Sequence, residues 1–138
     1  MNDVFLDTSY AIAIASKNDS LHQQSRSLAK KIKKENVPIV TTQAVLLEIG
    51  NALSKSRQRK LGIDLLESIE NNPNTKIIPI TNELYEKTFA LFRDRTDKEW
   101  GLVDCVSFVV MRDHQMSSAL TADEHFIQAG FRALLRED

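Results

Sequence analysis

Short runs of apolar residues alternate along the chain with segments whose apolar residues recur every three or four positions. A short continuous apolar run is typical of a strand buried on both faces, and the longer spacing is typical of an amphipathic helix. The runs predict strands at residues 4–6, 37–41, 76–80 and 118–121, with a short fifth at 131–135.

Amphipathic segments lie between these runs. The apolar stripe from Leu21 to Ile32 predicts a helix with Ser20 as its N-cap, and Thr41 or Thr42 is expected to cap the next one. Further helices are predicted at residues 59–70, from Thr81 onward, at 102–111, where the segment is apolar nearly all round, and at 124–128.

Strands that alternate with helices indicate βαβ units, and right-handed crossovers then give a mainly parallel sheet covered on both faces. The sequence therefore predicts an α/β fold, a three-layer α/β/α (Rossmann-like) domain with about five strands. Its 138 residues contain no repeat, low-complexity tract or linker, so we expect a single domain over residues 1–138.

Composition is ordinary for a globular protein, with 42% apolar and 27% charged residues. No apolar run approaches the roughly 20 residues that cross a bilayer, and no basic leader precedes an apolar stretch at the N-terminus. We therefore expect a cytoplasmic protein with no membrane partner. The lone Cys105 cannot form an internal disulfide and fits a reducing compartment.

The net charge of −1 indicates little by itself, but positive charge is concentrated at residues 30–34 and 55–60. A basic rim around an acidic centre suits a polyanionic substrate. The alternative is that both segments are solvated helix surfaces.

Four carboxylates interrupt apolar segments, where an unpaired charge is costly to desolvate. They are Asp7, Glu48, Asp104 and Asp123, and no Lys or Arg adjoins any of them. Asp7 and Asp123 follow predicted strands, whose carboxyl ends share one edge of a parallel sheet. Glu48 lies two turns into a helix and Asp104 in the first turn of another, so all four can converge there.

Convergence of these acids has an electrostatic cost. Two carboxylates about 4 Å apart repel by roughly 4 kcal/mol at an effective dielectric near 20, so the cluster needs protons or a cation. The set lacks the His and Cys ligands that favour zinc. With the hydroxyls of Thr8, Ser9 and Thr121 as outer partners, it favours Mg²⁺ or Mn²⁺.

Each acid also has a purely structural interpretation. Asp7 is an acceptable N-cap for a following helix, and Asp123 for the helix at 124–128. Glu48 is compatible with an exposed helical position. Asp104 is the hardest to explain in this way, because valines crowd its helix.

Four segments resemble, in order and spacing, the acidic motifs of PIN domains. They are 5–9 (FLDTS), 47–53 (LEIGNAL), 100–105 (WGLVDC) and 120–126 (LTADEHF). The resemblance covers the entire chain and is greatest for the small free-standing prokaryotic members, the VapC-type toxins of toxin–antitoxin pairs.

This resemblance implies a Mg²⁺- or Mn²⁺-dependent endoribonuclease in which Asp7, Glu48, Asp104 and Asp123 are the catalytic acids. Asp7 and Asp104 would be the firmest metal ligands, and the other two would complete the shell. The implied reaction is in-line hydrolysis of a phosphodiester, with 5′-phosphate and 3′-hydroxyl products.

Two residues depart from the family pattern. Val103 stands where relatives often have a small hydroxyl residue, and Ala122 where a polar residue is common, so these departures bear on activity more than on the fold.

The resemblance also implies an RNA substrate, a homodimer and a cognate antitoxin that inserts near the acids. The amphipathic helices within residues 43–70 are a candidate surface for that partner.

Several residues near the motifs are candidates for RNA contacts: Arg93, Arg95, Lys98, Trp100, Lys55, Arg57 and Arg59. Trp100 is expected either to stack on a base or to pack beneath its loop. His125 adjoins Asp123, but an all-carboxylate site does not need it, so we expect a partly exposed histidine at a helix start.

Three other functions compete with RNA cleavage. Related acid clusters cleave DNA or structured junctions, but the chain lacks inserted arches or a helical clamp. A non-catalytic binding module would not need all four acids. An aspartyl-phosphate phosphotransferase would need a second acid two residues after Asp7, where Ser9 stands.

Overall fold

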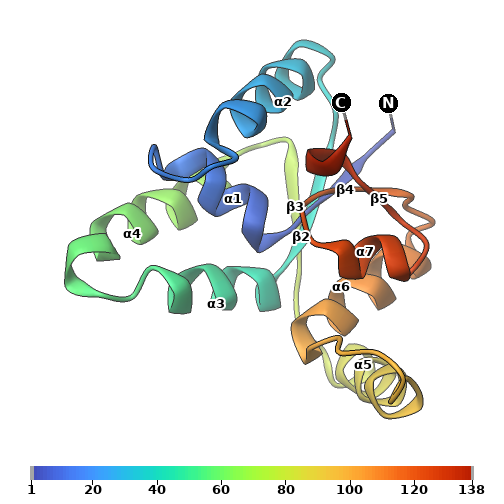
Figure 1. The fold of residues 1–138 in the computed structure, drawn as a ribbon. Coiled ribbons are helices and arrows are strands. Elements are labelled where there is room, and N and C mark those ends of the chain that lie inside the picture. Colours follow the sequence, from blue (N-terminus) through green and yellow to red (C-terminus); the bar gives the residue numbers. More distant parts are fainter. Residues whose placement is uncertain (1, 138) are drawn as a thin grey trace.

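The computed structural model describes residues 2–137 and forms a five-stranded sheet in which all strands are parallel (Figure 1). The strands are β1 (Val4–Leu6), β2 (Ile39–Thr42), β3 (Thr75–Ile78), β4 (Ser118–Leu120) and β5 (Arg132–Ala133). The helices are α1 (Thr8–Ala15), α2 (His22–Lys34), α3 (Gln43–Ala52), α4 (Ser56–Asn71), α5 (Asn82–Asp94), α6 (Leu102–Asp113), α7 (Glu124–Gln128) and the 3₁₀ turn η1 (Leu134–Arg136). The predicted α/β/α fold is confirmed, whereas the domain extent, 1–138, stays a prediction.

The strand order β3-β2-β1-β4-β5 explains where the helices lie. After β1, the chain forms β2 and β3 towards one edge of the sheet. It then crosses back and forms β4 and β5 on the other side of β1. Right-handed crossovers therefore place α1 to α4 on one face and α5 to α7 on the opposite face, as Figure 1 shows. The two connections diverge between β1 and β4, which is where ligands bind in open parallel sheets.

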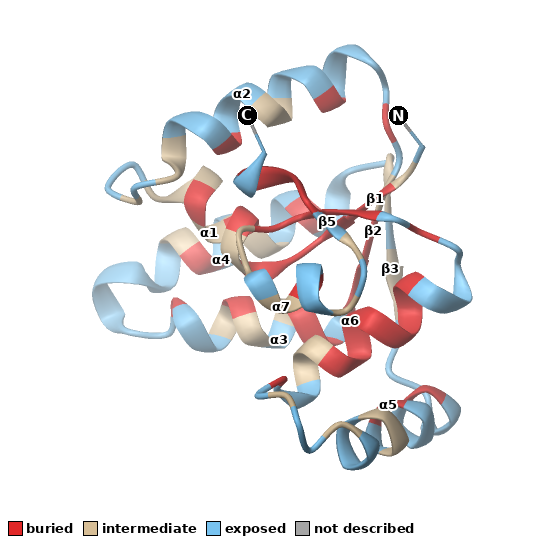
Figure 2. Ribbon diagram, turned by 45° about the vertical axis from the view of Figure 1, so that its right-hand side comes forward, coloured by how far each residue is buried: buried red, intermediate tan, exposed pale blue. Residues whose placement is uncertain are grey.

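The strands and the helix faces that cover them are largely buried (Figure 2), and aromatic side chains pack at the centre of this core. Phe5, Phe108 and Phe126 are fully buried, and the rings of Phe108 and Phe126 meet edge to face with centroids 5.0 Å apart. Helix α6 buries most of its residues, which confirms the predicted buried helix at 102–111. This core fixes the first turns of α6 and α7 relative to each other.

Several predicted boundaries are wrong by a few residues. Ser20 does not cap α2, because the helix begins at His22 and its N-cap Leu21 has no capping side chain. Thr42, rather than Thr41, caps α3, because its hydroxyl accepts from the Val45 amide at 3.2 Å. The fifth strand spans only 132–133, since the chain then turns into η1.

The hydrophobic pattern also gives no prediction for α1, whose residues are mostly apolar and carry no clear stripe. Helix α4 begins three residues earlier than predicted. Within residues 2–137, no helix combines the length and the apolar character needed to cross a membrane.

Candidate metal centre

Asp7 stands at the end of β1 and is almost fully buried, with 6% of its surface exposed. Its amide donates to the Leu120 carbonyl at 3.2 Å, which fixes it beside the end of β4. It occupies the N-cap position of α1, yet its side chain makes no capping hydrogen bond. Instead, carboxylate oxygen Oδ2 accepts from the Thr121 hydroxyl at 2.7 Å. The N-cap interpretation therefore does not explain this carboxylate.

The surroundings of Asp7 disfavour its charged form. The pKa of Asp7 is raised from 3.8 to about 6, mainly by burial and to a smaller extent by the charges of Glu48 and Asp104, against the opposing hydrogen bond from Thr121. A buried carboxylate with acidic neighbours is the arrangement that a bound cation relieves.

The three hydroxyls predicted as outer partners lie next to the acids. Ser9 Oγ lies 3.1 Å from Thr121 Oγ1 and 3.5 Å from Asp7 Oδ2. Thr121 Oγ1 also accepts from the Asp123 amide at 3.0 Å. The Thr8 hydroxyl donates to Glu48 Oε1, so it links the start of α1 to α3. These contacts hold the carboxylates of Asp7 and Glu48 and the backbone of Asp123, which come from three different parts of the chain.

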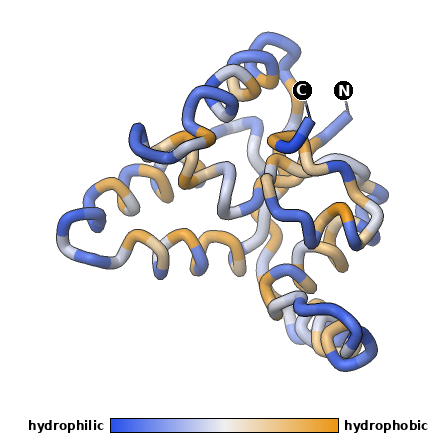
Figure 3. Tube along the Cα trace, viewed as in Figure 1, coloured by the Kyte–Doolittle hydropathy of each residue, from blue (hydrophilic) through white to orange (hydrophobic). Residues whose placement is uncertain are grey.

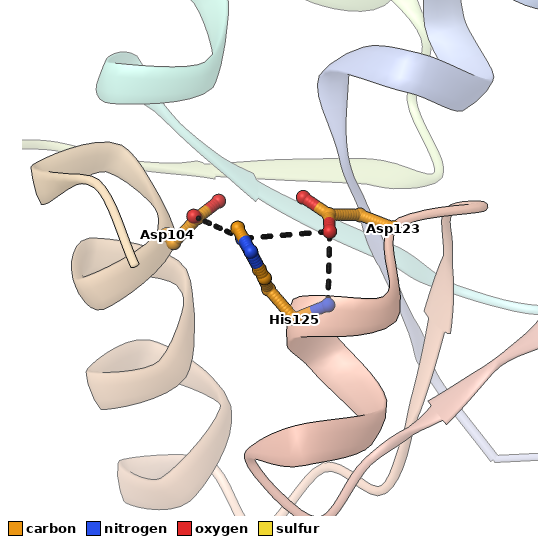
Figure 4. A group of neighbouring side chains, drawn as sticks. All are labelled: Asp104, Asp123 and His125. Atoms are coloured by element: carbon orange, nitrogen blue, oxygen red, sulfur yellow. Dashed lines mark hydrogen bonds and ion pairs between the residues drawn. The ribbon is translucent and has the colours of Figure 1, made fainter. Parts of the chain in front are cut away.

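Asp104 and Asp123 face each other across the start of α7, with the ring of His125 between them (Figure 4). Asp104 Oδ2 accepts from the Gly101 amide at 3.1 Å and lies 3.1 Å from His125 Nδ1. Asp123 Oδ1 accepts from the His125 amide at 2.9 Å and lies 3.5 Å from the same Nδ1. Asp123 thus caps α7, as its structural interpretation predicts, while it also faces Asp104.

His125 is partly exposed at the start of α7, as the sequence predicts, and its ring also contacts the acids. Its side chain is 25% exposed and points into the acidic cluster rather than to solvent, because the short α7 begins directly after Asp123. Partial burial lowers the pKa of His125, but the hydrogen bond to Asp104 and the charges of Asp123 and Asp104 outweigh it, and the net shift is upward. Sequence spacing did show His125 two residues from an acid.

The donor set fits a hard divalent cation. Among the ion pairs of residues 2–137, none joins Asp7, Glu48, Asp104 or Asp123 to a Lys or Arg. Asp104, Asp123 and His125 offer ligand atoms that lie within 4.8 Å of one another. Asp7 is linked to this group through Thr121 and through its electrostatic interaction with Asp104. The structure thus groups Asp104, Asp123 and His125, and it places Asp7 close enough to Asp104 and Glu48 for their charges to interact.

Trp100 packs beneath its loop, which removes it from the RNA-contact candidates. Its side chain is 4% exposed and its ring meets Phe108 edge to face at 4.9 Å. Its indole N–H donates to Gln128 at 3.0 Å, and the guanidinium of Arg95 lies 4.9 Å from its ring centre. A base therefore finds no open face on Trp100 in this structure.

The basic candidates of the α5–α6 loop are partly engaged. Arg95 donates to both carboxylate oxygens of Asp97, at 2.9 and 3.0 Å, and Lys98 lies 4.0 Å from the same group. Arg93 lies 5.7 Å from the Phe89 ring centre and keeps 65% of its side chain exposed. Arg93 is therefore the most accessible cation of this loop.

The second basic group lies at the tip of the α3–α4 hairpin, away from the sheet (Figure 1). There Arg59 donates twice to the Ser54 carbonyl, at 2.7 and 3.1 Å, and so closes the turn. Lys55 and Arg57 are exposed. The structure does not bring these three residues to the acids.

Comparison with known proteins matches this geometry to one family. A family model described as "PIN domain" matches residues 4–132. A curated protein of Mycobacterium tuberculosis, "23S rRNA-specific endonuclease VapC20", is 26% identical over 129 residues, which cover 93% of this chain and 95% of the relative.

Solved structures show the same fold at low sequence identity. The crystal structure of M. tuberculosis VapC20, titled a sarcin-ricin loop cleaving toxin, aligns with a TM-score of 0.81 and 24% identity, over 94% of this chain and 96% of that one. VapBC2 of Rickettsia felis, bound to promoter DNA, aligns with a TM-score of 0.66 and 16% identity, over 96% of this chain and 97% of that one. FitAcB of Neisseria gonorrhoeae aligns with a TM-score of 0.63 and 16% identity, over 96% of this chain and 95% of that one. With the family model spanning nearly its whole length, the chain belongs to the PIN domain family.

Proposed function

We propose that this chain is a Mg²⁺- or Mn²⁺-dependent endoribonuclease and the toxin of a type II toxin–antitoxin pair, acting in the cytoplasm. The observation that carries the proposal is Asp7, a buried carboxylate without a basic partner, beside Glu48 and Asp104. The VapC20 relative, which matches over most of both chains, is named as an endonuclease of 23S rRNA. Folded ribosomal RNA is therefore the first substrate to test.

Asp7, Glu48, Asp104 and Asp123 would hold the cation, which would supply Lewis acidity and neutralise charge on the scissile phosphate. The protein residues provide the orientation. Thr121 holds the carboxylate of Asp7, and Thr8 holds that of Glu48. A carboxylate of the cluster would accept the proton of the attacking water as its oxygen bonds to phosphorus. The bond from phosphorus to the 3′ oxygen would break, and that oxygen would take up a proton, which gives a 5′-phosphate and a 3′-hydroxyl.

The antitoxin would occupy an apolar groove of about 350 Å³ between α3, α5 and α6. Glu48 and Leu47 line it from α3, a helix with hydrophobic positions along its length (Figure 3). Large apolar side chains are exposed in this region: Leu47, Ile80, Tyr85, Phe89, Phe92 and Leu102. A partner segment in this groove would bury exposed apolar surface and cover Glu48. The predicted surface within residues 43–70 thus extends to α5 and α6.

A homodimer is part of the proposal, because Phe89 and Phe92 are exposed on α5 and do not line this groove. Its test is the molar mass of the purified chain, measured by light scattering over a range of concentrations. Phe92→Ser, which removes exposed apolar surface far from the acids in sequence, should shift the mass towards the monomer. A monomeric wild type at all concentrations would contradict the dimer.

Cleavage assays test the enzymatic proposal. Purified protein is incubated with ribosomal RNA, single-stranded DNA and duplex DNA, in Mg²⁺, Mn²⁺ or EDTA. We expect cleavage of RNA with either cation, none in EDTA, and at least a hundredfold loss in Asp7→Asn and Asp104→Asn. Asp64→Asn is the matched control, because Asp64 is exposed and pairs only with Lys60. Metal-independent cleavage, a preference for DNA, or full activity in both site variants would each contradict the proposal.

A further inference from the structure

The ring of His125 occupies the space where the carboxylates of α6 and α7 meet (Figure 4). Its Nδ1 atom lies 3.1 Å from Asp104 Oδ2 and 3.5 Å from Asp123 Oδ1. The three ligand atoms all lie within 4.8 Å of one another. Without a cation the contact between Nδ1 and Asp104 is a hydrogen bond, and a bound ion would take the place of its proton.

These separations are close to those between ligands of one cation. Neighbouring ligands of an octahedral ion with bonds of about 2.1 Å lie about 3.0 Å apart. The contact of 3.1 Å between Nδ1 and Asp104 Oδ2 matches this value, and the 3.5 Å contact with Asp123 requires a shift of a few tenths of an ångström. The imidazole and the two carboxylates therefore form a group of suitable size to hold one ion.

The fold holds His125 in this position from both sides. The preceding N-cap, Asp123, accepts from the His125 amide at 2.9 Å. The following residue, Phe126, is fully buried and packs against Phe108 of α6 at 5.0 Å. The backbone of His125 is thus fixed relative to α6, which carries Asp104. Preorganisation of this kind is what a metal ligand needs.

We infer that His125 is a direct nitrogen ligand of the cation held by Asp104 and Asp123, and that it makes the site prefer Mn²⁺ to Mg²⁺. Imidazole suits transition-metal ions, whereas Mg²⁺ prefers an all-oxygen shell. The inference deepens the proposed function and rests on its metal site. It also replaces the all-carboxylate shell predicted from the sequence with a mixed one.

Pulsed electron paramagnetic resonance of the Mn²⁺-loaded protein tests this inference without any activity measurement. We expect a ¹⁴N coupling from a directly bound imidazole in the wild type and its loss in His125→Gln. Calorimetry should show Mn²⁺ binding weakened at least about tenfold in this variant, with Mg²⁺ binding changed less than about threefold. His114→Gln is the matched control, because His114 is exposed and its ring nitrogen contacts only the Val110 carbonyl, at 2.9 Å.

The wild-type spectrum alone can overturn the inference, so it does not depend on how well the variant folds. Bound Mn²⁺ without a ¹⁴N coupling would show that His125 is not a ligand, and a coupling that persists in His125→Gln would assign it to another nitrogen. RNA cleavage measured on the same preparations separates the two proposals. Cleavage without the coupling refutes the ligand alone, whereas the coupling without cleavage refutes the nuclease and leaves the ligand in place.

Discussion

Replacing Asp7 by Asn should stabilise the metal-free protein at neutral pH. Burial raises the pKa of Asp7 from 3.8 to about 6, so ionising this carboxyl weakens the folded state by about 3 kcal/mol, at 1.36 kcal/mol per pKa unit. Asparagine has the same shape and no charge, and its oxygen can still accept from Thr121. Allowing for a weaker hydrogen bond, we expect the free energy of unfolding to rise by about 1–3 kcal/mol.

The gain has a defined pH window. Below about pH 4 the carboxyl is protonated in the folded and the unfolded chain alike, so Asp7→Asn should be no more stable than the wild type. Between about pH 4 and 6 the unfolded chain ionises while the folded protein retains the proton, so the wild type loses stability relative to the variant. Above about pH 6 the difference should stay constant.

Urea denaturation in EDTA, at a series of pH values from 4 to 8, measures this difference, with Asp64→Asn as the exposed control. A difference that does not change with pH, or a variant less stable than the wild type at neutral pH, would refute the account of Asp7. Adding Mn²⁺ should reverse the order. At a thousandfold excess over its Kd the ion stabilises the wild type by about 4.1 kcal/mol, and it should bind Asp7→Asn far more weakly.

Two further substitutions test how the site is held. Thr121→Val removes a hydroxyl that contacts Asp7 at 2.7 Å and the Asp123 amide at 3.0 Å, so the free energy of unfolding should fall by about 1–3 kcal/mol. Mn²⁺ binding, measured by calorimetry, should also weaken. Unchanged binding would argue against an orienting role of Thr121. Trp100→Ala should cost about 3–5 kcal/mol in thermal or urea unfolding, because the ring packs on Phe108. Loss of RNA affinity at unchanged stability would instead mean that Trp100 stacks on a base.

Much of this fold can be predicted from the sequence because the periodicity changes sharply between strands and helices. The apolar run at 4–6 is β1, and the Thr81 cap begins α5, its hydroxyl accepting from the Leu84 amide at 3.1 Å. Helix α1 escapes the prediction because it is apolar on nearly all sides, so it carries no stripe. Boundaries such as the end of β5 depend on tertiary contacts that a local pattern does not contain.

The candidate site could be predicted in part for a similar reason. A carboxylate within an apolar segment is visible in the sequence, and parallel-strand topology brings Asp7 and Asp123 to one edge. The directions of side chains are set by packing, so the sequence left two positions open for Trp100 and did not predict that the His125 ring contacts Asp104 and Asp123. Arg59 likewise carries the charge expected of a phosphate contact, yet its guanidinium donates to the Ser54 carbonyl and closes a turn.

The chemistry at the cleaved RNA end tests the central claim most directly. Ribosomal RNA is treated with wild-type protein in Mn²⁺, and the new fragments are ligated to an adaptor that accepts only a 5′-phosphate. The account predicts ligated products that depend on the cation and disappear with Asp104→Asn. Fragments that end in a 5′-hydroxyl and a 2′,3′-cyclic phosphate, or that form equally in EDTA, would contradict metal-dependent hydrolysis at these acids.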